Sequence, residues 1–220
     1  MSGEPAAISL RRAGRRYGRD RIFEGINLEI APGRFVLLRG GNGTGKTTLL
    51  RVIATRLRLS AGEGSVFGFD LHRQAHEVRR RTVMVSVLGG AYPMLSAREN
   101  LELTATLYGV SPDSERLLER VGLGGTGSKL VRSFSSGMKK RLGLARLLLD
   151  GSQLWLLDEP YSTLDEDGRA LVDELVHEAG ERGVTVLMAT HEDLRPGARR
   201  PDAELRIAAG QLTVERSVGS

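Results

Sequence analysis

Cysteine is absent from this 220-residue chain, and its absence excludes several kinds of chemistry. The protein cannot form a disulfide scaffold, a thiolate metal site or a cysteine nucleophile. A chain without disulfides is also compatible with a reducing compartment.

Long hydrophobic runs are missing as well. The first residues, MSGEPAAISLRR, contain no apolar core, so we expect no signal peptide. The longest stretch without a charged residue covers residues 82–97, and Gly89, Gly90 and Pro93 interrupt it. Because a membrane-spanning helix needs about 20 apolar residues, we expect a soluble chain, or one that attaches to a membrane only through a partner.

Lysine is scarce, so arginine carries most of the net charge of +5. A basic balance indicates polyanionic neighbours such as nucleotides, nucleic acid or an anionic membrane face. A compositional bias towards arginine explains the charge equally well. The densest basic run is interpreted as a solvated edge, and its members are Arg11, Arg12, Arg15, Arg16, Arg19 and Arg21.

The remaining composition is that of a globular protein. Hydrophobic residues make up 40% and charged residues 27% of the chain, which excludes a disordered chain and a collagen. The length fits one sizeable domain, or one domain with an inserted lobe.

Four short apolar runs predict buried strands, and they cover residues 35–40, 82–87, 154–158 and 184–190. Helical patterns follow some of them, at residues 46–59 and 166–182. Strands of this kind alternating with helices predict an α/β fold whose mostly parallel sheet is covered on both faces.

The two ends of the chain have a different pattern. Residues 8–12 and 26–30 alternate in polarity and predict an antiparallel β subdomain at the N-terminus. Residues 205–215 predict a hairpin that turns at Ala209 and Gly210.

Helical patterns between the second and third buried strands predict an inserted helical subdomain. Ser96 and Glu99 form a capping-box pattern at its start. Further helices are expected at about residues 112–121 and 136–149. We therefore predict one domain over residues 1–220, with a core at about 1–87 and 150–220 and a helical subdomain at about 96–149.

Residues 40–47, GGNGTGKT, match the phosphate-binding P-loop pattern between a predicted strand and a predicted helix. The glycines let backbone N–H groups converge on phosphates, and the helix N-terminus adds positive potential. Lys46 is predicted to reach the β- and γ-phosphates, and Thr47 to ligate Mg²⁺. The predicted nucleotide-binding residues here are Gly40, Asn42, Gly43, Thr44, Gly45, Lys46, Thr47 and Thr48.

Two acids end the third buried strand. Asp158 and Glu159 follow the run LWLL, at the edge where a parallel sheet places its ligands. Together with the P-loop upstream, this pattern predicts Asp158 as a Mg²⁺ ligand and Glu159 as the group that polarises the attacking water.

A third segment, SFSSGM at residues 133–138, stands upstream of these acids. With the first two motifs, the chain resembles the ATP-binding-cassette (ABC) family, whose LSGGQ-like signature corresponds to residues 134–138. The resemblance extends over nearly the whole chain. It implies that Ser135, Ser136 and Gly137 bind nucleotide, and that the cofactors are ATP and Mg²⁺.

The resemblance implies roles for three more residues. Tyr17 corresponds to an aromatic that stacks on adenine, although an ordinary strand tyrosine is the alternative. Asp165 lies in the D-loop pattern STLD, and His191 corresponds to the switch histidine that contacts the γ-phosphate. Lys46, Glu159 and His191 are thus the implied catalytic residues. The other histidines, His72, His76 and His177, are expected on helical surfaces without a role.

Two positions depart from the family pattern. Ungapped counting back from Ser96 places Val87 where the family carries a glutamine that touches Mg²⁺ or water. Valine cannot ligate a metal, so either the role is dispensed with or the neighbouring Ser86 serves it weakly. The departure concerns the coupling step and the rate, and not nucleotide binding. Met138 replaces the glutamine of the signature, which is a milder departure.

The resemblance implies an ATP-hydrolysing subunit of a membrane transporter. Such subunits pair head to tail at the cytoplasmic face of the membrane, each ATP lying between one copy's P-loop and the other's signature. Separate integral membrane subunits are the implied partners, and no specific nucleic acid is expected. The finer resemblance is to the haem-exporter branch of cytochrome c maturation, although polysaccharide and drug exporters share some of its features. A soluble regulatory or nucleic-acid-associated ATPase, and a non-enzymatic nucleotide-binding module, are the alternatives.

Overall fold

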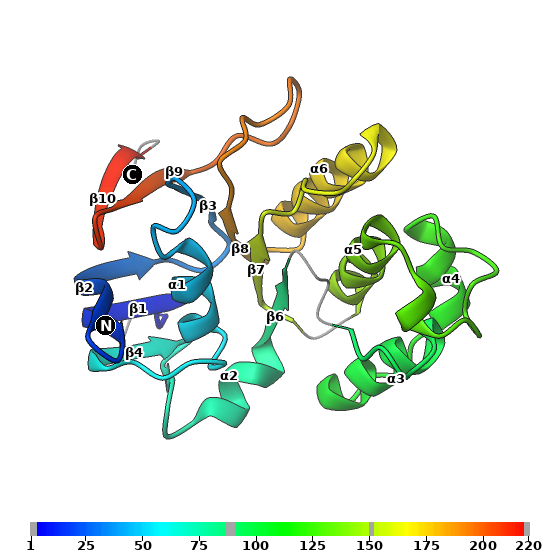
Figure 1. Ribbon diagram of the computed structural model, residues 1–220, viewed down its shortest axis with the longest axis horizontal. Coiled ribbons are helices and arrows are strands. Elements are labelled where there is room, and N and C mark those ends of the chain that lie inside the picture. The colour runs from blue at the N-terminus through cyan, green and yellow to red at the C-terminus, as the bar shows by residue number, and fades with distance from the viewer. Residues whose placement is uncertain (1–3, 87–90, 150–151, 218–220) are drawn as a thin grey trace.

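A computed structural model describes residues 4–86, 91–149 and 152–217 (Figure 1). Its larger sheet has six strands in the order β10-β9-β3-β8-β7-β6. Every pair in it is parallel except β9 with β10, which confirms the mostly parallel sheet. The strands are β3 (Phe35–Arg39), β6 (Thr82–Val85), β7 (Leu154–Asp158), β8 (Thr185–Ala189), β9 (Ala203–Ala208) and β10 (Gln211–Ser217).

The N-terminal residues form a four-stranded antiparallel sheet in the order β2-β1-β4-β5. Its strands are β1 (Ile8–Tyr17), β2 (Asp20–Ile30), β4 (Ala61–Val66) and β5 (Phe69–Asp70). Ile8 pairs with Ile30 and Leu10 with Leu28, so the predicted antiparallel subdomain is confirmed. The alternating pattern did not reveal β4, because its sequence AGEGSV contains two glycines and only one buried side chain.

Helix α1 (Lys46–Ile53) lies between the two sheets (Figure 1). The prediction of a helix over residues 46–59 was wrong at its C-terminal end. Thr55 adopts a left-handed backbone with φ 57°, which an α-helix cannot contain. Helix α6 (Glu166–Glu181) ends one residue before its predicted boundary, and α2 (Ala75–Arg81) precedes β6.

Three helices form the inserted lobe, separate from the antiparallel sheet (Figure 1). They are α3 (Ala97–Tyr108), α4 (Ser114–Arg120) and α5 (Ser136–Ala145). The capping box of α3 is confirmed: the Ser96 hydroxyl accepts from the Glu99 N–H at 3.2 Å, and the Glu99 carboxylate accepts from the Ser96 N–H at 2.7 Å. Asp113 caps α4, so that helix begins two residues after Pro112. Helix α5 ends at Ala145 and continues as a 3₁₀ turn, Arg146–Leu148.

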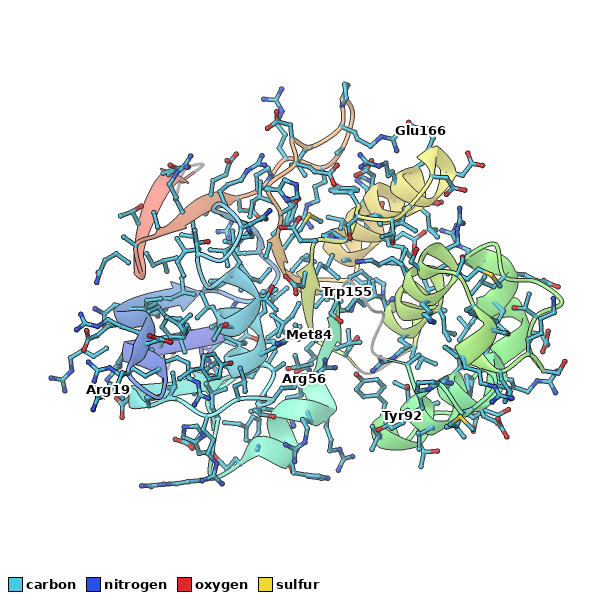
Figure 2. The ribbon with its side chains drawn as sticks, viewed as in Figure 1. Arg19, Arg56, Met84, Tyr92, Trp155 and Glu166 are labelled. Carbon is cyan, nitrogen blue, oxygen red and sulfur yellow. The ribbon has the colours of Figure 1, made fainter. Side chains whose placement is uncertain are left out.

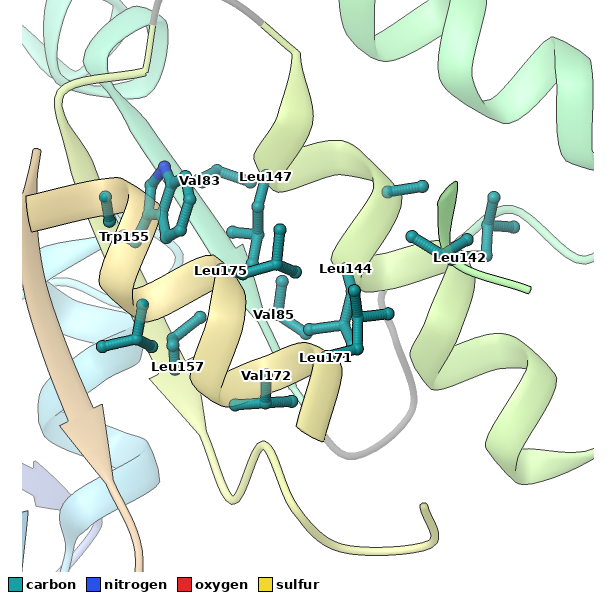
Figure 3. Packing of buried hydrophobic residues seen from close by; sticks show 14 of the residues in the cluster. Val83, Val85, Leu142, Leu144, Leu147, Trp155, Leu157, Leu171, Val172 and Leu175 are labelled. Atoms are coloured by element: carbon teal, nitrogen blue, oxygen red, sulfur yellow. The ribbon is translucent and has the colours of Figure 1, made fainter. Parts of the chain in front are cut away.

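Alternate residues of β7 enter two different hydrophobic cores. Trp155 and Leu157 pack with α6 and the lobe (Figure 3), whereas Leu154 and Leu156 pack with α1 and the antiparallel sheet. Successive strand side chains point to opposite faces, so a strand buried on both sides must be apolar throughout. This packing holds the carboxyl end of β7, and with it Asp158, in a fixed position.

No helix among the described residues is both long and apolar enough to cross a membrane.

Candidate functional site: a phosphate-binding loop and its acids

The predicted phosphate loop connects β3 to α1 at the carboxyl edge of the large sheet. Gly45 precedes α1 with φ 104°, a conformation that side chains rarely allow. A Cβ added to Gly40 would lie 2.6 Å from the Ile207 carbonyl oxygen. Glycine at these two positions therefore lets the loop backbone approach the sheet closely and then lead into the N-terminus of α1. Anions are stabilised at such a helix N-terminus.

Lys46 reaches back over this loop from the first residue of α1. Its ammonium donates to the Gly40 carbonyl at 2.8 Å and the Gly41 carbonyl at 3.1 Å. The same Nζ lies 3.4 Å from Oε1 of Glu159. The side chain is only 6% exposed, so the cation stands at the inner end of the loop, within reach of a phosphate.

Asp158 and Thr47 meet across the sheet edge, the Thr47 hydroxyl donating to the Asp158 carboxylate at 2.9 Å. Burial raises the pKa of the Asp158 carboxyl, and the bond from Thr47 opposes this shift. Buried hydroxyl and carboxylate oxygens are the donor types that Mg²⁺ takes. Within the described parts of the chain, no group of three or more His, Asp and Glu side chains could hold a metal.

Glu159 lies between the two other residues predicted to be catalytic. Its Oε2 is 3.0 Å from Nδ1 of His191, and its Oε1 faces Lys46. Burial alone would raise the pKa of this carboxyl, but the hydrogen bond from His191 and the charge of Lys46 outweigh it and lower the pKa. The structure therefore brings Lys46, Glu159 and His191 together, with an ionised carboxylate in the middle.

The signature residues lie at the start of α5, away from the phosphate loop; they are Ser135, Ser136 and Gly137. The Ser135 hydroxyl caps this helix by accepting from the Met138 N–H at 3.2 Å. All three residues line a cavity with Asp165, which caps α6 and pairs with Arg141 at 2.5 Å. None of the described residues lining this cavity belongs to the phosphate loop. The signature segment and the loop are thus separate surfaces of one chain.

The other predicted nucleotide-binding residues lie around the loop. Asn42 and Gly43 are exposed in its turn, the Thr44 hydroxyl donates to the Gly41 carbonyl, and Thr48 is half-buried in α1. Tyr17 ends β1, is 43% exposed and has the Arg15 guanidinium over its ring at 4.6 Å.

Four further residues carried expectations from the sequence. Val87 lies outside the described residues. His76 and His177 lie on exposed helical surfaces as predicted, but the expectation for His72 was wrong. It lies in a turn before α2, where its N–H donates to Asp70.

Sequence reasoning missed Lys140, which is completely buried on α5. Its ammonium donates to the Glu159 carbonyl oxygen at 2.9 Å. The spacing Ser136–Lys140, one helical turn, places the lysine on the same face of α5 as the signature. This spacing was the sequence signal that could have pointed to Lys140.

The phosphate loop, the strand-end acids and the parallel sheet together define a P-loop nucleoside triphosphatase fold. Residues 23–162 match the family model described as ABC transporter. The chain is 40% identical over 214 residues to the daunorubicin resistance ATP-binding protein DrrA3 of Streptomyces coeruleorubidus, covering 95% of this chain and 67% of that protein. It is 39% identical over 176 residues to the cytochrome c biogenesis ATP-binding export protein CcmA of Methylococcus capsulatus, covering 79% of this chain and 85% of that protein.

The fold is also that of a solved cassette. The ATP-binding cassette MJ0796, in a dimeric post-hydrolysis state with ADP and Pi, superposes with a TM-score of 0.84 at 23% identity, covering 97% of this chain and 99% of that one. The chain therefore belongs to the ABC transporter ATPase family. It is an ATP-binding subunit of that family and an ATP hydrolase.

Proposed function

We propose that two copies of this chain pack head to tail and hydrolyse two ATP molecules between them, powering transport through separate integral membrane subunits. The observation that carries this proposal is the separation of the two nucleotide-binding surfaces. Lys46, Glu159 and His191 converge on the phosphate loop, while Ser135–Gly137 line a cavity with no described phosphate-loop residue. A site split in this way is completed by a second copy.

Within each site, Lys46 leaves the Gly40 and Gly41 carbonyls and binds the β- and γ-phosphates. The phosphates are surrounded by backbone N–H groups of the loop, from Gly40 through Asn42, Gly43, Thr44 and Gly45 to Thr48. Tyr17 stacks on the adenine. Glu159 accepts a hydrogen bond from the attacking water, and His191 contacts the γ-phosphate. Because Glu159 is already ionised by its neighbours, it is ready to orient that water at neutral pH.

Thr47 and Asp158 would hold Mg²⁺, which when bound neutralises charge on the β- and γ-phosphate oxygens. From the second copy, Ser135, Ser136 and Gly137 approach the γ-phosphate, and Asp165 lies at the contact between copies. Residues 1–220 act as one cassette, with a core at about 1–87 and 150–220 and the helical subdomain at about 96–149.

The helical subdomain offers a surface for the membrane subunits. Among the described residues, several large apolar side chains are exposed in and before α3: Tyr92, Met94, Leu103 and Leu107. Leu103 and Leu107 are one helical turn apart on the same face, and Figure 2 shows Tyr92 on the side of the lobe towards Arg56. Exposed apolar patches of this kind mark protein interaction sites. The cassette would thus sit peripherally at the cytoplasmic face of the membrane.

For the cargo, we propose haem export for cytochrome c biogenesis. The similarity to the CcmA protein of Methylococcus capsulatus over most of both chains supports this. The similarity to DrrA3 supports a second candidate, an exporter of a drug-like amphiphile. Deleting the gene and measuring covalently haem-loaded cytochrome c alongside daunorubicin sensitivity separates the two: loss of the cytochrome supports haem export, and new drug sensitivity supports the second candidate.

A further inference from the structure

Lys140 is a completely buried lysine that contacts the backbone of the proposed catalytic acid, Glu159. Lys140, in the second turn of α5, has no exposed surface. Burial lowers the pKa of its ammonium to about 8, against the attraction of Asp158 and Glu159. Burying an ammonium costs free energy that an apolar side chain of the same shape would not. The position therefore calls for an explanation other than packing.

The lysine's hydrogen bond goes to the backbone of Glu159, not to its carboxylate. The Glu159 carbonyl oxygen accepts from Lys140 Nζ at 2.9 Å, from the Ser162 hydroxyl at 2.8 Å and from the Ser162 N–H at 3.2 Å. On the other side of the residue, the Glu159 N–H donates to the Ala189 carbonyl at 2.8 Å. The peptide groups on both sides of Glu159 are thus held in place.

Glu159 needs this support because its backbone is strained. It has φ 48°, a left-handed conformation that costs a side-chain-bearing residue about 1–3 kcal/mol. In this conformation the carboxylate lies between Lys46 and His191. A strained residue persists only where its surroundings over-determine it, and Lys140 supplies one of the bonds that do so.

The same helix also carries the signature segment. A Cβ on Gly137 would lie 3.1 Å from the Thr163 carbonyl, so the first turn of α5 packs closely on the segment that follows Glu159. Helix α5 therefore contacts residues 159–163 at two points, the Thr163 carbonyl through Gly137 and the Glu159 carbonyl through Lys140. In the proposed dimer, Ser135 at the start of α5 serves the ATP site of the other copy.

We propose that Lys140 is a positioning residue for Glu159: it fixes the strained backbone of the catalytic acid and makes its geometry depend on helix α5, which serves the opposite ATP site. This inference rests on the proposed function for the dimer, but its first part concerns a single chain. Lys140 does not touch ATP and acts only through Glu159.

The test compares Lys140→Met, which keeps the length and removes the charge and the donor, with Lys139→Met on the same helix. We expect kcat for ATP hydrolysis to fall at least tenfold in Lys140→Met, with ATP affinity within threefold of the wild type. Lys139→Met, which removes the same charge one residue away, should change kcat less than twofold. The ATP-bound dimer should still form in Lys140→Met and should accumulate, because closure survives and hydrolysis does not.

A double-mutant cycle separates positioning from a merely structural role. In the Glu159→Gln background, Lys140→Met should change the residual turnover less than twofold, because the group it positions is already disabled. The thermal midpoint of Lys140→Met should not fall, since an apolar side chain replaces a buried charge. Ser162→Ala, which removes another donor to the same carbonyl from a half-buried position, should lower kcat by a smaller factor with the same non-additivity.

Unchanged kcat in Lys140→Met, or equal fold losses with and without Glu159, would overturn the inference and leave the proposed ATPase function intact. If Lys140→Met does not fold, Ser162→Ala provides the test. Losses of kcat that are fully additive between Ser162→Ala and Glu159→Gln would then overturn the inference. Absence of ATP-dependent dimers in every variant, including Glu159→Gln alone, would instead contradict the proposed function.

Discussion

At the residue scale, the site is a chain of contacts that joins Lys46, Glu159 and His191. Lys46 faces Glu159 at 3.4 Å, and Glu159 faces His191 at 3.0 Å. Lys46 is also held by two loop carbonyls. A polyphosphate must therefore compete with these oxygens for the ammonium, and it does so with a full negative charge.

The first prediction concerns Lys46. Lys46→Ala removes the cation that we propose binds the phosphates, so ATP affinity should fall by about 10- to 100-fold, the range that a charged hydrogen bond of about 1.5–3 kcal/mol gives. Equilibrium binding of a fluorescent ATP analogue at fixed Mg²⁺ measures it. Arg51→Ala, which removes a cation from the last turn of the same helix, is the control and should bind nearly normally. Unchanged affinity in Lys46→Ala would remove this lysine from the phosphate site.

At the scale of elements, short sequence patterns predicted the helix start and the strands that depend on residues close together in the chain. The capping box at Ser96 and Glu99 places the start of α3 correctly, because both partners lie within one turn. The apolar runs of β3, β7 and β8 were predictable because strands buried on both faces must be apolar throughout. Asp158 and Glu159 could be placed because they stand at the end of such a strand, and Lys46 because the glycine-rich loop after β3 leads into the first turn of α1.

Elements whose stability comes from distant partners were not predictable. Strand β4 has two glycines and only one buried side chain, and pairing with β1 makes it a strand. The end of α1 at Ile53 reflects the left-handed Thr55 and not a proline or glycine. The contact of Lys140 could not be predicted for the same reason, because its partner, the Glu159 carbonyl, lies 19 positions away in sequence.

The second prediction tests the cap of α3. Ser96→Ala removes the side-chain acceptor for the Glu99 N–H, and losing an N-cap costs about 1 kcal/mol of folding free energy. Urea unfolding followed by circular dichroism should show a lower midpoint and an unchanged slope. Ser133→Ala, whose exposed hydroxyl bonds only to the Leu130 carbonyl among the described contacts, should shift the midpoint less. An equal shift in both variants would contradict the capping role.

At the scale of the whole molecule, the two lobes present different surfaces. The core carries the phosphate loop, and the helical lobe carries the signature segment together with the exposed apolar residues of α3. Arg19 lies in the turn between β1 and β2, at the periphery of the molecule (Figure 2). Most of the basic run is exposed to solvent, but Arg11, Arg12, Arg15 and Arg16 lie on β1, an inner strand between β2 and β4, so the run does not form an edge of the sheet. The arrangement allows nucleotide contacts on one surface to be transmitted to a partner on another.

The third prediction concerns that partner surface. Leu107, 65% exposed on α3, should lie in the contact with the membrane subunits. Leu107→Asp should abolish co-purification with a membrane protein from detergent extracts and leave basal ATP hydrolysis unchanged. Val214→Asp, at a position 67% exposed on β10, is the matched control and should co-purify normally. Equal retention of the partner by both variants would place the docking surface elsewhere.

The most direct test of the central claim is the mass of Glu159→Gln with and without ATP and Mg²⁺, measured by size exclusion with light scattering. The substitution keeps the shape of the acid and removes the charge that we propose orients the water, so ATP should bind, turnover should collapse, and the closed dimer should accumulate. If two copies share each ATP site, we expect a monomer of 23.9 kDa without ATP and twice that mass with it. Adding Ser135→Arg, which places a bulky cation in the signature surface, should abolish the dimer and leave the Glu159→Gln monomer folded. A Glu159→Gln protein that binds ATP, stays monomeric and still turns it over would contradict a site shared between two copies.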